Sequence, residues 1–230
     1  MKKSFKNYLR SFFLLTTLFF TDQVYSDGDS FEYNLYNNYG VVGTIHTPSA
    51  RTFDEGVHGL TVYYGDPNQT VTLSASPFDW FDASFFYTNV QDRPYCYDFT
   101  SEICTQDFKD KGFNFKVRLK EQGKLPAIAI GLNDFAGTGI YSSEYIVGSY
   151  GINRTDFHFG LGFGLLDGSD LSFKNPLSHI SDKFNTRPTI AARLGGSFQP
   201  SRYFSGETAS PFFGVSHALN NKLLLKAEYD

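Results

Sequence analysis

The sequence predicts an all-β protein: an antiparallel transmembrane β-barrel, or the incomplete N-terminal portion of a larger barrel. In the segment 155–165 every second residue from Phe157 to Leu165 is Phe or Leu, and the residues between them are His or Gly. Side chains of a β-strand point alternately to its two faces, so this segment predicts a strand with one apolar face. Its length, about ten residues, is also that of a tilted strand crossing a bilayer.

The composition agrees with strands better than with helices. The 230 residues include 25 Phe, 15 Tyr and 21 Gly but one Trp and one Met. Aromatic residues favour strands and the aromatic girdles at the two surfaces of a membrane. Beyond the first 26 residues no apolar run is long enough for a transmembrane helix, so a membrane-bound chain would cross as strands.

Residues 1–26 predict a signal peptide, because basic residues precede the apolar run 11–20 and Ser26 offers a small residue for cleavage. No Cys lies at the cleavage point, so a lipid-anchored mature terminus is not expected. Residues 27–39 are interpreted as an extended mature N-terminus. Without the signal peptide the chain has 16 basic and 23 acidic residues, and its net charge of -7 argues against binding to nucleic acid.

Cys96 and Cys104 are the only cysteines, and both follow the export signal. Export to an oxidising compartment favours a disulfide between them, with two free thiols as the alternative. A structural zinc site needs four ligands, and the sequence has no Cys/His pairs that would complete one. The sequence therefore predicts no metal site here.

Nine strands are predicted within the barrel region, residues 40–230. They lie at 60–64, 70–76, 81–88, 113–120, 127–132, 141–150, 155–165, from 213–216 onward, and at 223–229. Gly and Pro limit residues 40–51 to a short strand and a turn. Residues 166–209 are long and polar, and we expect a large excursion that could include a short strand at 189–194.

The lengths of the predicted connections alternate along the chain. Long or medium connections lie at 89–111, 133–140 and 166–209. Short connections lie at 121–124, 151–154 and 219–222. Outer-membrane barrels have short periplasmic turns and long outer loops, so this order favours a barrel over a soluble sandwich and places the long connections outside. The short connection at 65–68 breaks the pattern.

An odd number of strands does not complete a single-chain bacterial barrel, which normally closes with an even number. The chain also stops within a strand at Asp230. An unpaired strand edge is not tolerated in lipid. We therefore expect either the N-terminal part of a longer protein or a barrel closed by another chain.

Polar residues between the apolar positions predict a wet inner face. The lumen-facing candidates are Asp82, Asn114, Lys116, Arg118, Glu144, Asp156, His158, Lys226 and Glu228. A carboxylate on a barrel strand must face water or a partner, and Glu144 could pair with Lys116 or Arg118 in the lumen. Such residues could form a polar wall along which a sugar chain slides, or structural ion pairs inside the barrel. Phe86 and Tyr63 are aromatic exceptions on the inner face.

No catalytic residue is predicted. The five His residues have no metal-ligand spacing, and no G-x-S-x-G motif of a serine hydrolase is present. The glycines at 160, 162 and 164 lie within a strand and precede no helix, which excludes a dinucleotide-binding loop. We expect a non-enzymatic protein without a cofactor.

Four segments of the chain resemble motifs of one known protein family. Residues 43–51 resemble the motif G-L-I-x-x-P-T-A-R, and residues 108–119 resemble Y-K-D-K-G-F-D-x-K-x-R-L. Residues 134–145 resemble D-F-x-G-T-G-x-F-S-S-E-Y, and residues 226–230 resemble K-x-E-Y-D. Together they resemble the YjbH-type exopolysaccharide biosynthesis proteins of the Gram-negative outer membrane. The resemblance covers the chain from about residue 40 onward and implies the N-terminal part of a large outer-membrane barrel. Some members look like lipoproteins, for which this sequence lacks the required Cys.

The resemblance further implies a part in the production or export of an extracellular polysaccharide. Expected partners are outer-membrane lipid, the extracellular polysaccharide and periplasmic polysaccharide-export proteins. The alternative is a soluble, secreted β-sandwich that binds carbohydrate. Solubility without detergent would favour that alternative.

Overall fold

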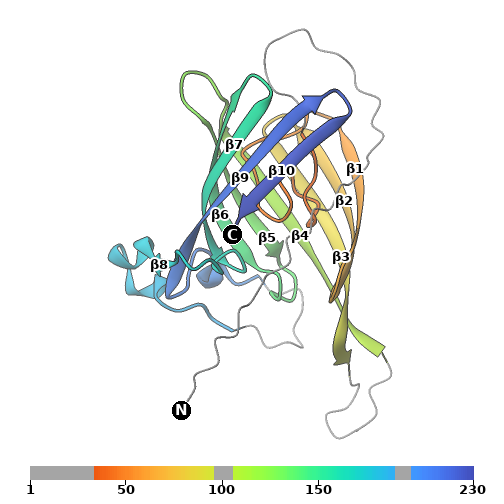
Figure 1. Ribbon diagram of the computed structural model, residues 1–230. Helices are drawn as coiled ribbons and strands as arrows, with labels where there is room; N and C mark the ends of the chain where they lie inside the picture. The colour runs from red at the N-terminus through yellow and green to blue at the C-terminus, as the bar shows by residue number, and fades with distance from the viewer. Residues whose placement is uncertain (1–33, 96–105, 190–197) are drawn as a thin grey trace, which may run out of the picture.

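The computed structural model describes residues 34–95, 106–189 and 198–230. A single antiparallel sheet dominates it and curls around the inner segment, residues 34–52, drawn in orange in Figure 1. Within these residues no helix is long and apolar enough to span a membrane. The predicted signal peptide, both cysteines and residues 190–194 of the possible short strand lie outside the described ranges.

Nearly all strands pair with their neighbours in sequence. The bounds are β1 (His58–Tyr64), β2 (Asn68–Phe78), β3 (Phe81–Tyr95), β4 (Gln106–Lys120), β5 (Ala127–Phe135), β6 (Ser143–Ile152), β7 (Thr155–Gly164), β9 (Thr208–Asn220) and β10 (Leu223–Tyr229). The two-residue strand β8 (Phe173–Lys174) pairs only with β9. This confirms the all-β antiparallel prediction, but β1 and β10 are edges that do not pair with each other, so the sheet is not closed.

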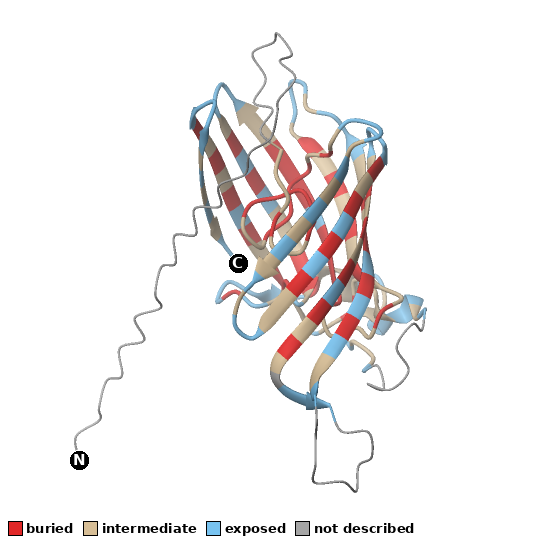
Figure 2. Ribbon diagram, turned by 90° about the vertical axis from the view of Figure 1, so that its right-hand side faces the viewer, coloured by how far each residue is buried: buried red, intermediate tan, exposed pale blue. Residues whose placement is uncertain are grey.

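The polarity of the sheet is the reverse of a soluble one, and β2 shows it clearly. The hydroxyl residues Thr70, Thr72 and Ser74 are buried, whereas Val71 and Leu73 between them are exposed, Leu73 by 58%. Figure 2 shows the same banding of buried and exposed residues along several strands. The segments with an alternating pattern therefore form strands, as expected, and their polar residues lie on the concave side, which holds the inner segment.

The concave side also holds an apolar cluster, in addition to the aromatic exceptions Phe86 and Tyr63 that were expected on the inner face. The buried cluster consists of Ala50, Ala127, Ala129, Tyr145, Val147, Leu166 and Phe212. Aromatic rings in this patch lie across glycines of neighbouring strands. Phe212 pairs with Gly160, where a Cβ atom would be 2.1 Å from the ring. The glycines of β7 thus make room for adjacent side chains.

The connection expected at 89–111 is shorter than predicted. β3 and β4 keep pairing as a two-stranded ribbon beyond Val90, and after an irregularity Pro94 lies opposite Asp107. Polar side chains do not prevent such pairing, because the hydrogen bonds of the ladder belong to the backbone.

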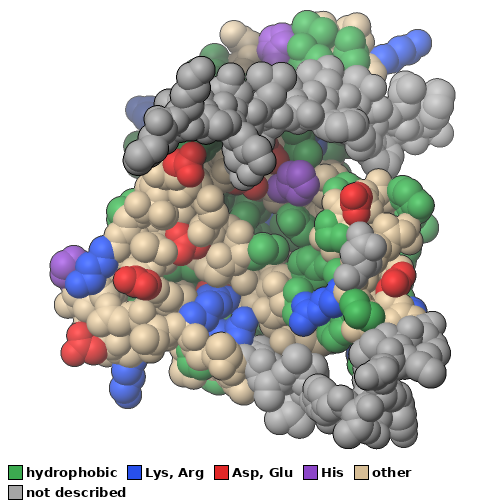
Figure 3. All heavy atoms as spheres, turned by 60° about the horizontal axis from the view of Figure 1, so that its bottom comes forward, with side chains coloured by type: hydrophobic (Ala, Val, Ile, Leu, Met, Phe, Trp, Pro, Cys, Tyr) green, Lys and Arg blue, Asp and Glu red, His purple; other side chains and the backbone are tan. Residues whose placement is uncertain are grey.

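Long connections still share one end of the sheet, as the alternation predicted. Residues 136–142 and the excursion 165–207 follow β5 and β7 at this end. The excursion contains β8 and three short 3₁₀-helices, η1 (Pro176–His179), η2 (Asp182–Phe184) and η3 (Pro200–Arg202). Figure 3 views this end, where acidic and basic side chains are interspersed with hydrophobic ones.

The excursion covers part of the apolar face of β7. Phe163 was expected to share the exposed side of Phe157 and Phe159, yet it is buried. Its ring packs edge-on against Phe204, with ring centroids 5.4 Å apart. The described strands form one sheet in place of the two packed sheets that the sandwich alternative requires.

Candidate functional site

The inner segment is folded by its own turns before it meets the sheet. Isolated bridges join Tyr36 to Val42 and Gly43 to Pro48, so the short strand expected within residues 40–51 does not join a ladder. The Asn37 side chain accepts hydrogen bonds from the backbone of Tyr39 and Val41. Gly and Pro favour successive turns over a strand, and these turns aim several backbone amides outward.

Glu228 of β10 receives these amides. Its carboxylate accepts backbone hydrogen bonds from Ile45 (3.0 Å), His46 (2.8 Å) and Thr47 (3.0 Å). The hydroxyls of Thr44 and Thr47 donate to it at 2.8 and 2.9 Å. Consecutive amides that converge on one carboxylate form an anion-binding nest. The turn 44–47 therefore binds a specific side chain of a distant strand.

Lys226 lies two residues earlier, on the same face of β10, and binds carbonyl oxygens of the same turn, whereas Glu228 binds its amides. Its Nζ donates to the carbonyl oxygens of Gly43 (2.8 Å) and Thr44 (2.9 Å). A strand places residues i and i+2 on one face, so the two side chains reach the same turn. Lys226 binds its backbone acceptors, and Glu228 binds its backbone donors.

His46 makes a second contact with Glu228, between Nδ1 and Oε1 at 3.1 Å. This hydrogen bond raises the pKa of His46, while burial acts in the opposite direction. His46, Glu228 and Asp230 bring three potential metal-ligand atoms within 4.8 Å of one another. Both oxygens of Glu228 already accept hydrogen bonds from the inner segment.

Lys116 of β4 is 1% exposed and lies under the inner segment. Its Nζ lies 3.1 Å from Asp82 Oδ2 and donates to the carbonyl oxygens of Val42 (3.3 Å) and Arg51. The carboxylate offsets the cost of burying the ammonium group, and the two carbonyls use its remaining protons. Lys116 therefore binds both ends of the segment 42–51.

Arg51 anchors the end of the inner segment to β7. Its guanidinium donates two hydrogen bonds to Asp156, from Nε to Oδ2 at 2.8 Å and from Nη2 to Oδ1 at 2.7 Å. The same guanidinium donates to Gln122, which also binds the backbone of Gly151. Bidentate Arg–carboxylate pairs fix geometry as well as charge.

The remaining contacts bind the backbone of the inner segment along its length. Asn114 donates to the carbonyl of Tyr39 at 3.2 Å, and Ser74 donates to that of Gly40 at 2.7 Å. The amide of Ala50 donates to the hydroxyl of Ser149, whose Oγ lies 2.8 Å from His158 Nδ1. These contacts come from the concave face of three strands, β2, β4 and β6.

Seven of the nine predicted inner-face residues belong to this arrangement. The residues in direct contact with the inner segment are Asn114, Lys116, Asp156, Lys226 and Glu228. Asp82 and His158 act through Lys116 and Ser149. Arg118 lies apart, near the end of β4, where it pairs with Glu121 at 2.7 Å.

Glu144 has a different partner from the two expected. Its carboxylate is fully buried and binds both arms of Arg187, each at 2.7 Å. The backbone amide of Phe204 donates to the same carboxylate at 2.8 Å. The prediction of Lys116 or Arg118 was wrong because the excursion folds back over β6 and supplies its own cation.

Sequence reasoning missed Arg51, Arg187 and the turn 44–47 as binding groups. The only available signal was the family resemblance, whose first segment contains Arg51 and whose last contains Lys226 and Glu228. These two segments meet in the structure.

A family model described as "Exopolysaccharide biosynthesis protein YbjH" matches residues 35–230. The chain belongs to the YjbH family. It is 36% identical over 196 residues to a protein of Escherichia coli (strain K12) named "Uncharacterized lipoprotein YjbH". The alignment covers 84% of this chain but 28% of that relative, so the chain spans little more than a quarter of its length. No solved structure matches this YjbH-family chain.

Proposed function

We propose that this YjbH-family chain forms part of a non-enzymatic outer-membrane β-barrel that takes part in exopolysaccharide biosynthesis or export. The observation that carries the proposal is the reversed polarity of the sheet. Large apolar side chains such as Leu73, Phe113 and Phe159 are exposed on its outer face, while hydroxyls, amides and charges are buried inside. A lipid-facing barrel has this polarity, and a soluble sheet has the opposite one.

Strand length supports the same proposal. β2, β5, β6 and β7 contain 11, 9, 10 and 10 residues. A tilted strand needs about 9–11 residues to cross the hydrocarbon core. Trp80 and Phe78, stacked with ring centroids 5.3 Å apart, lie at the turn between β2 and β3 and suit an interfacial position.

Function in a membrane requires the edges β1 and β10 to be paired. Each unpaired backbone group in lipid costs several kcal/mol. We propose that further strands close the barrel between these edges, either from the natural chain or from another one. The length of the E. coli relative leaves ample room for them.

The inner face supports binding and positioning more than catalysis. Lys116, Asp156 and Glu228 are each bound to the inner segment, and Glu144 is bound to Arg187. Charged groups used in this way stabilise the interior and leave no free nucleophile–base pair among them. Outer-membrane lipid and the polysaccharide are the proposed partners, together with periplasmic export proteins.

Two variants test the lipid-facing role. Leu73→Arg places a charge on the outer face of β2, and Ile180→Arg places one on the excursion, where Ile180 is 76% exposed. The protein at its natural length is expressed in its own host, and outer-membrane fractions and exopolysaccharide are measured. A midplane Arg costs about 2–4 kcal/mol in a barrel, so Leu73→Arg should reduce assembly while Ile180→Arg should not. Equal effects, or a wild-type protein soluble without detergent, would contradict the proposal.

A further inference from the structure

A β-bulge near the end of β5 turns two consecutive residues toward the concave face. The pairing of β4 with β5 shifts at this bulge, where Asn133 and Asp134 together lie opposite Asn114. Both are buried, Asp134 with 3% of its surface exposed, whereas strict alternation would have turned one of them outward. Bulges re-aim side chains in this way and are common next to functional sites.

Asp134 uses one carboxylate oxygen to hold the connection 136–142. Its Oδ2 accepts a hydrogen bond from the backbone amide of Tyr141 at 3.1 Å. Its Oδ1 lies against β4, in space that exists because residues 112 and 137 are glycines, since a Cβ atom on either would collide with this oxygen. Oδ1 is buried and has no hydrogen-bond partner among the described residues.

Asp110 brings a second buried carboxylate to the same face of β4, two residues before Gly112. It is 1% exposed, and its Oδ1 accepts the backbone amide of Lys111 at 2.7 Å. Its Oδ2 is buried and, like Asp134 Oδ1, has no hydrogen-bond partner in the described part of the chain. The two carboxylates are close enough to repel each other electrostatically.

The nearest arginines are engaged elsewhere. Arg202 donates to the carbonyl oxygens of Gly139 and Pro188, each at 2.8 Å. The guanidinium of Arg93 lies over the ring of Phe108, 4.7 Å from its centroid. Among the described residues no Lys, Arg or His forms an ion pair with either buried carboxylate. Burial of carboxylates without a counter-charge is strongly destabilising, so this arrangement calls for a cation.

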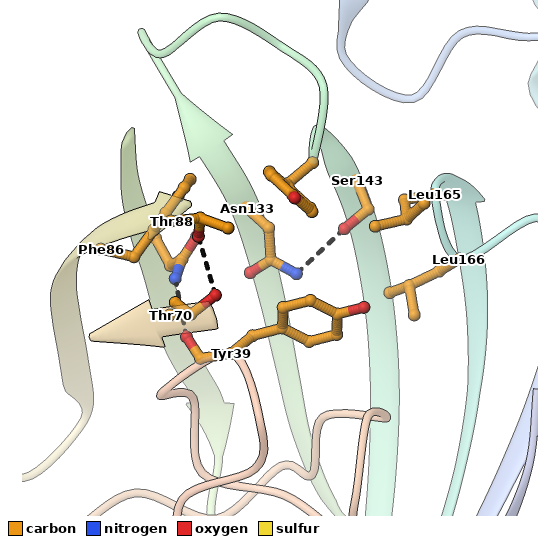
Figure 4. Close-up of a pocket in the computed structure, with 10 residues that line it drawn as sticks. Tyr39, Thr70, Phe86, Thr88, Asn133, Ser143, Leu165 and Leu166 are labelled. Carbon is orange, nitrogen blue, oxygen red and sulfur yellow. Dashed lines mark hydrogen bonds between the residues drawn. The ribbon is translucent and has the colours of Figure 1, made fainter. Parts of the chain in front are cut away.

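A cavity of about 20 Å³ adjoins both carboxylates, since its lining includes Thr88, which pairs with Asp110, and Tyr141, which binds Asp134. Figure 4 shows Asn133 beside this cavity, donating to Ser143 at 2.9 Å. Its Oδ1 is a further buried acceptor without a partner among the described residues. The cavity has room for about one water molecule.

We propose that Asp110 and Asp134 bind a Ca²⁺ ion between β4 and the connection 136–142. Ca²⁺ takes about six to eight oxygen ligands from carboxylates, amide and backbone carbonyls and water. The carbonyl oxygen of Lys111 faces the same space, because a Cβ atom on Gly137 would be 2.8 Å from it. The lack of Cys and His ligands, which argued against zinc, does not bear on a site made of oxygens. The inference goes beyond the proposed function and does not depend on it.

The test uses the protein at its natural length, purified in detergent and freed of divalent ions with EDTA. Ca²⁺ binding is measured by titration calorimetry, and amide exchange of residues 137–141 is compared in Ca²⁺ and in EDTA. We expect saturable binding with a Kd at or below about 1 mM. Exchange of residues 137–141 should slow about tenfold or more in saturating Ca²⁺, because an ion that binds only the ordered connection stabilises it by mass action.

Asp110→Asn and Asp134→Asn keep the size of the side chain and remove its charge. Each should weaken Ca²⁺ binding at least about tenfold and abolish the effect of Ca²⁺ on exchange of residues 137–141. The matched control is Asp54→Asn, the same change at an exposed carboxylate before β1, which should behave like the wild type. Heat-modifiable gel migration checks folding of every variant.

Two results would overturn the inference. One is wild-type exchange at residues 137–141 that is the same in Ca²⁺ and in EDTA, which would show that the carboxylates share a proton instead of an ion. The other is a Ca²⁺ response that survives in both Asp110→Asn and Asp134→Asn. The wild-type comparison needs no variant, so it decides even if the Asn variants do not fold. A wild-type protein soluble without detergent overturns the proposed function and leaves this test unaffected.

Discussion

Glu228 and His46 lie 182 residues apart and are joined by two backbone hydrogen bonds, at 2.8 and 3.0 Å, and by a side-chain contact at 3.1 Å. The contact connects β10, one edge of the sheet, to the tip of a turn in the inner segment. Lys226 binds the other side of that turn. The edge strand and the inner segment therefore stabilise each other. A substitution that breaks these contacts should destabilise both.

Replacing Glu228 by Ala should release the turn 44–47. Several hydrogen bonds to a charged acceptor would be lost at once, and one such bond contributes about 1.5–3 kcal/mol. Amide exchange at residues 45–47 should then accelerate at least a hundredfold relative to the wild type. The control is Glu121→Ala, which removes an exposed carboxylate near the end of β4. Unchanged protection in Glu228→Ala would show that the nest does not hold the segment.

Docking of the turn should weaken as the pH rises. The hydrogen bond to Glu228 raises the pKa of His46 above its ordinary value near 6.5. A raised pKa in the folded state means that the stabilisation is fully present below about pH 6.5 and is lost as the pH passes the raised value. Lys226, Glu228 and Asp230 are the charged groups close to His46.

Protection factors of residues 45–47, measured from pH 5.5 to 8.5 and corrected for intrinsic exchange, check this pH dependence. His46→Gln should flatten the curve, since glutamine keeps a hydrogen-bond donor but does not titrate. A pH dependence that survives in His46→Gln would assign it to another group.

Arg187→Ala should destabilise the protein by about 3–5 kcal/mol, because it leaves the buried Glu144 carboxylate without its cation. Adding Glu144→Gln to this variant should restore part of the loss, because the uncompensated charge is then removed. The temperature at which gel migration changes provides the measurement. If Arg187→Ala melts like the wild type, the ion pair does not hold the excursion onto β6.

Gly160→Ala should cost about 1–3 kcal/mol, because the new methyl group would lie 2.1 Å from the Phe212 ring and force it to move. Gly168→Ala is the matched control, since nothing lies within 4 Å of the position of its Cβ atom. Melting temperatures of the two variants should differ clearly. Equal values would mean that the Phe212 ring has space to shift.

Much of the sheet could be predicted because its signal is local. The alternation in 155–165 yielded β7, and the run 113–120 yielded most of β4. The burial of Asn114, Lys116 and Asp156 follows from the same two-residue period. The extension of β3 and β4 beyond Val90 could not be predicted, because polar residues there carry no alternating pattern.

The sequence by itself determined the all-β class, the approximate positions of most strands, the polarity of the two faces and the family. Each of these depends on neighbouring residues or on motifs read along the chain. Only the tertiary structure decided that residues 34–52 lie inside the curve of the sheet, and that Glu144 pairs with Arg187 instead of Lys116 or Arg118. A charged side chain determines that it needs a partner of opposite polarity, but the curvature of the sheet and the path of the excursion determine which distant groups come within reach.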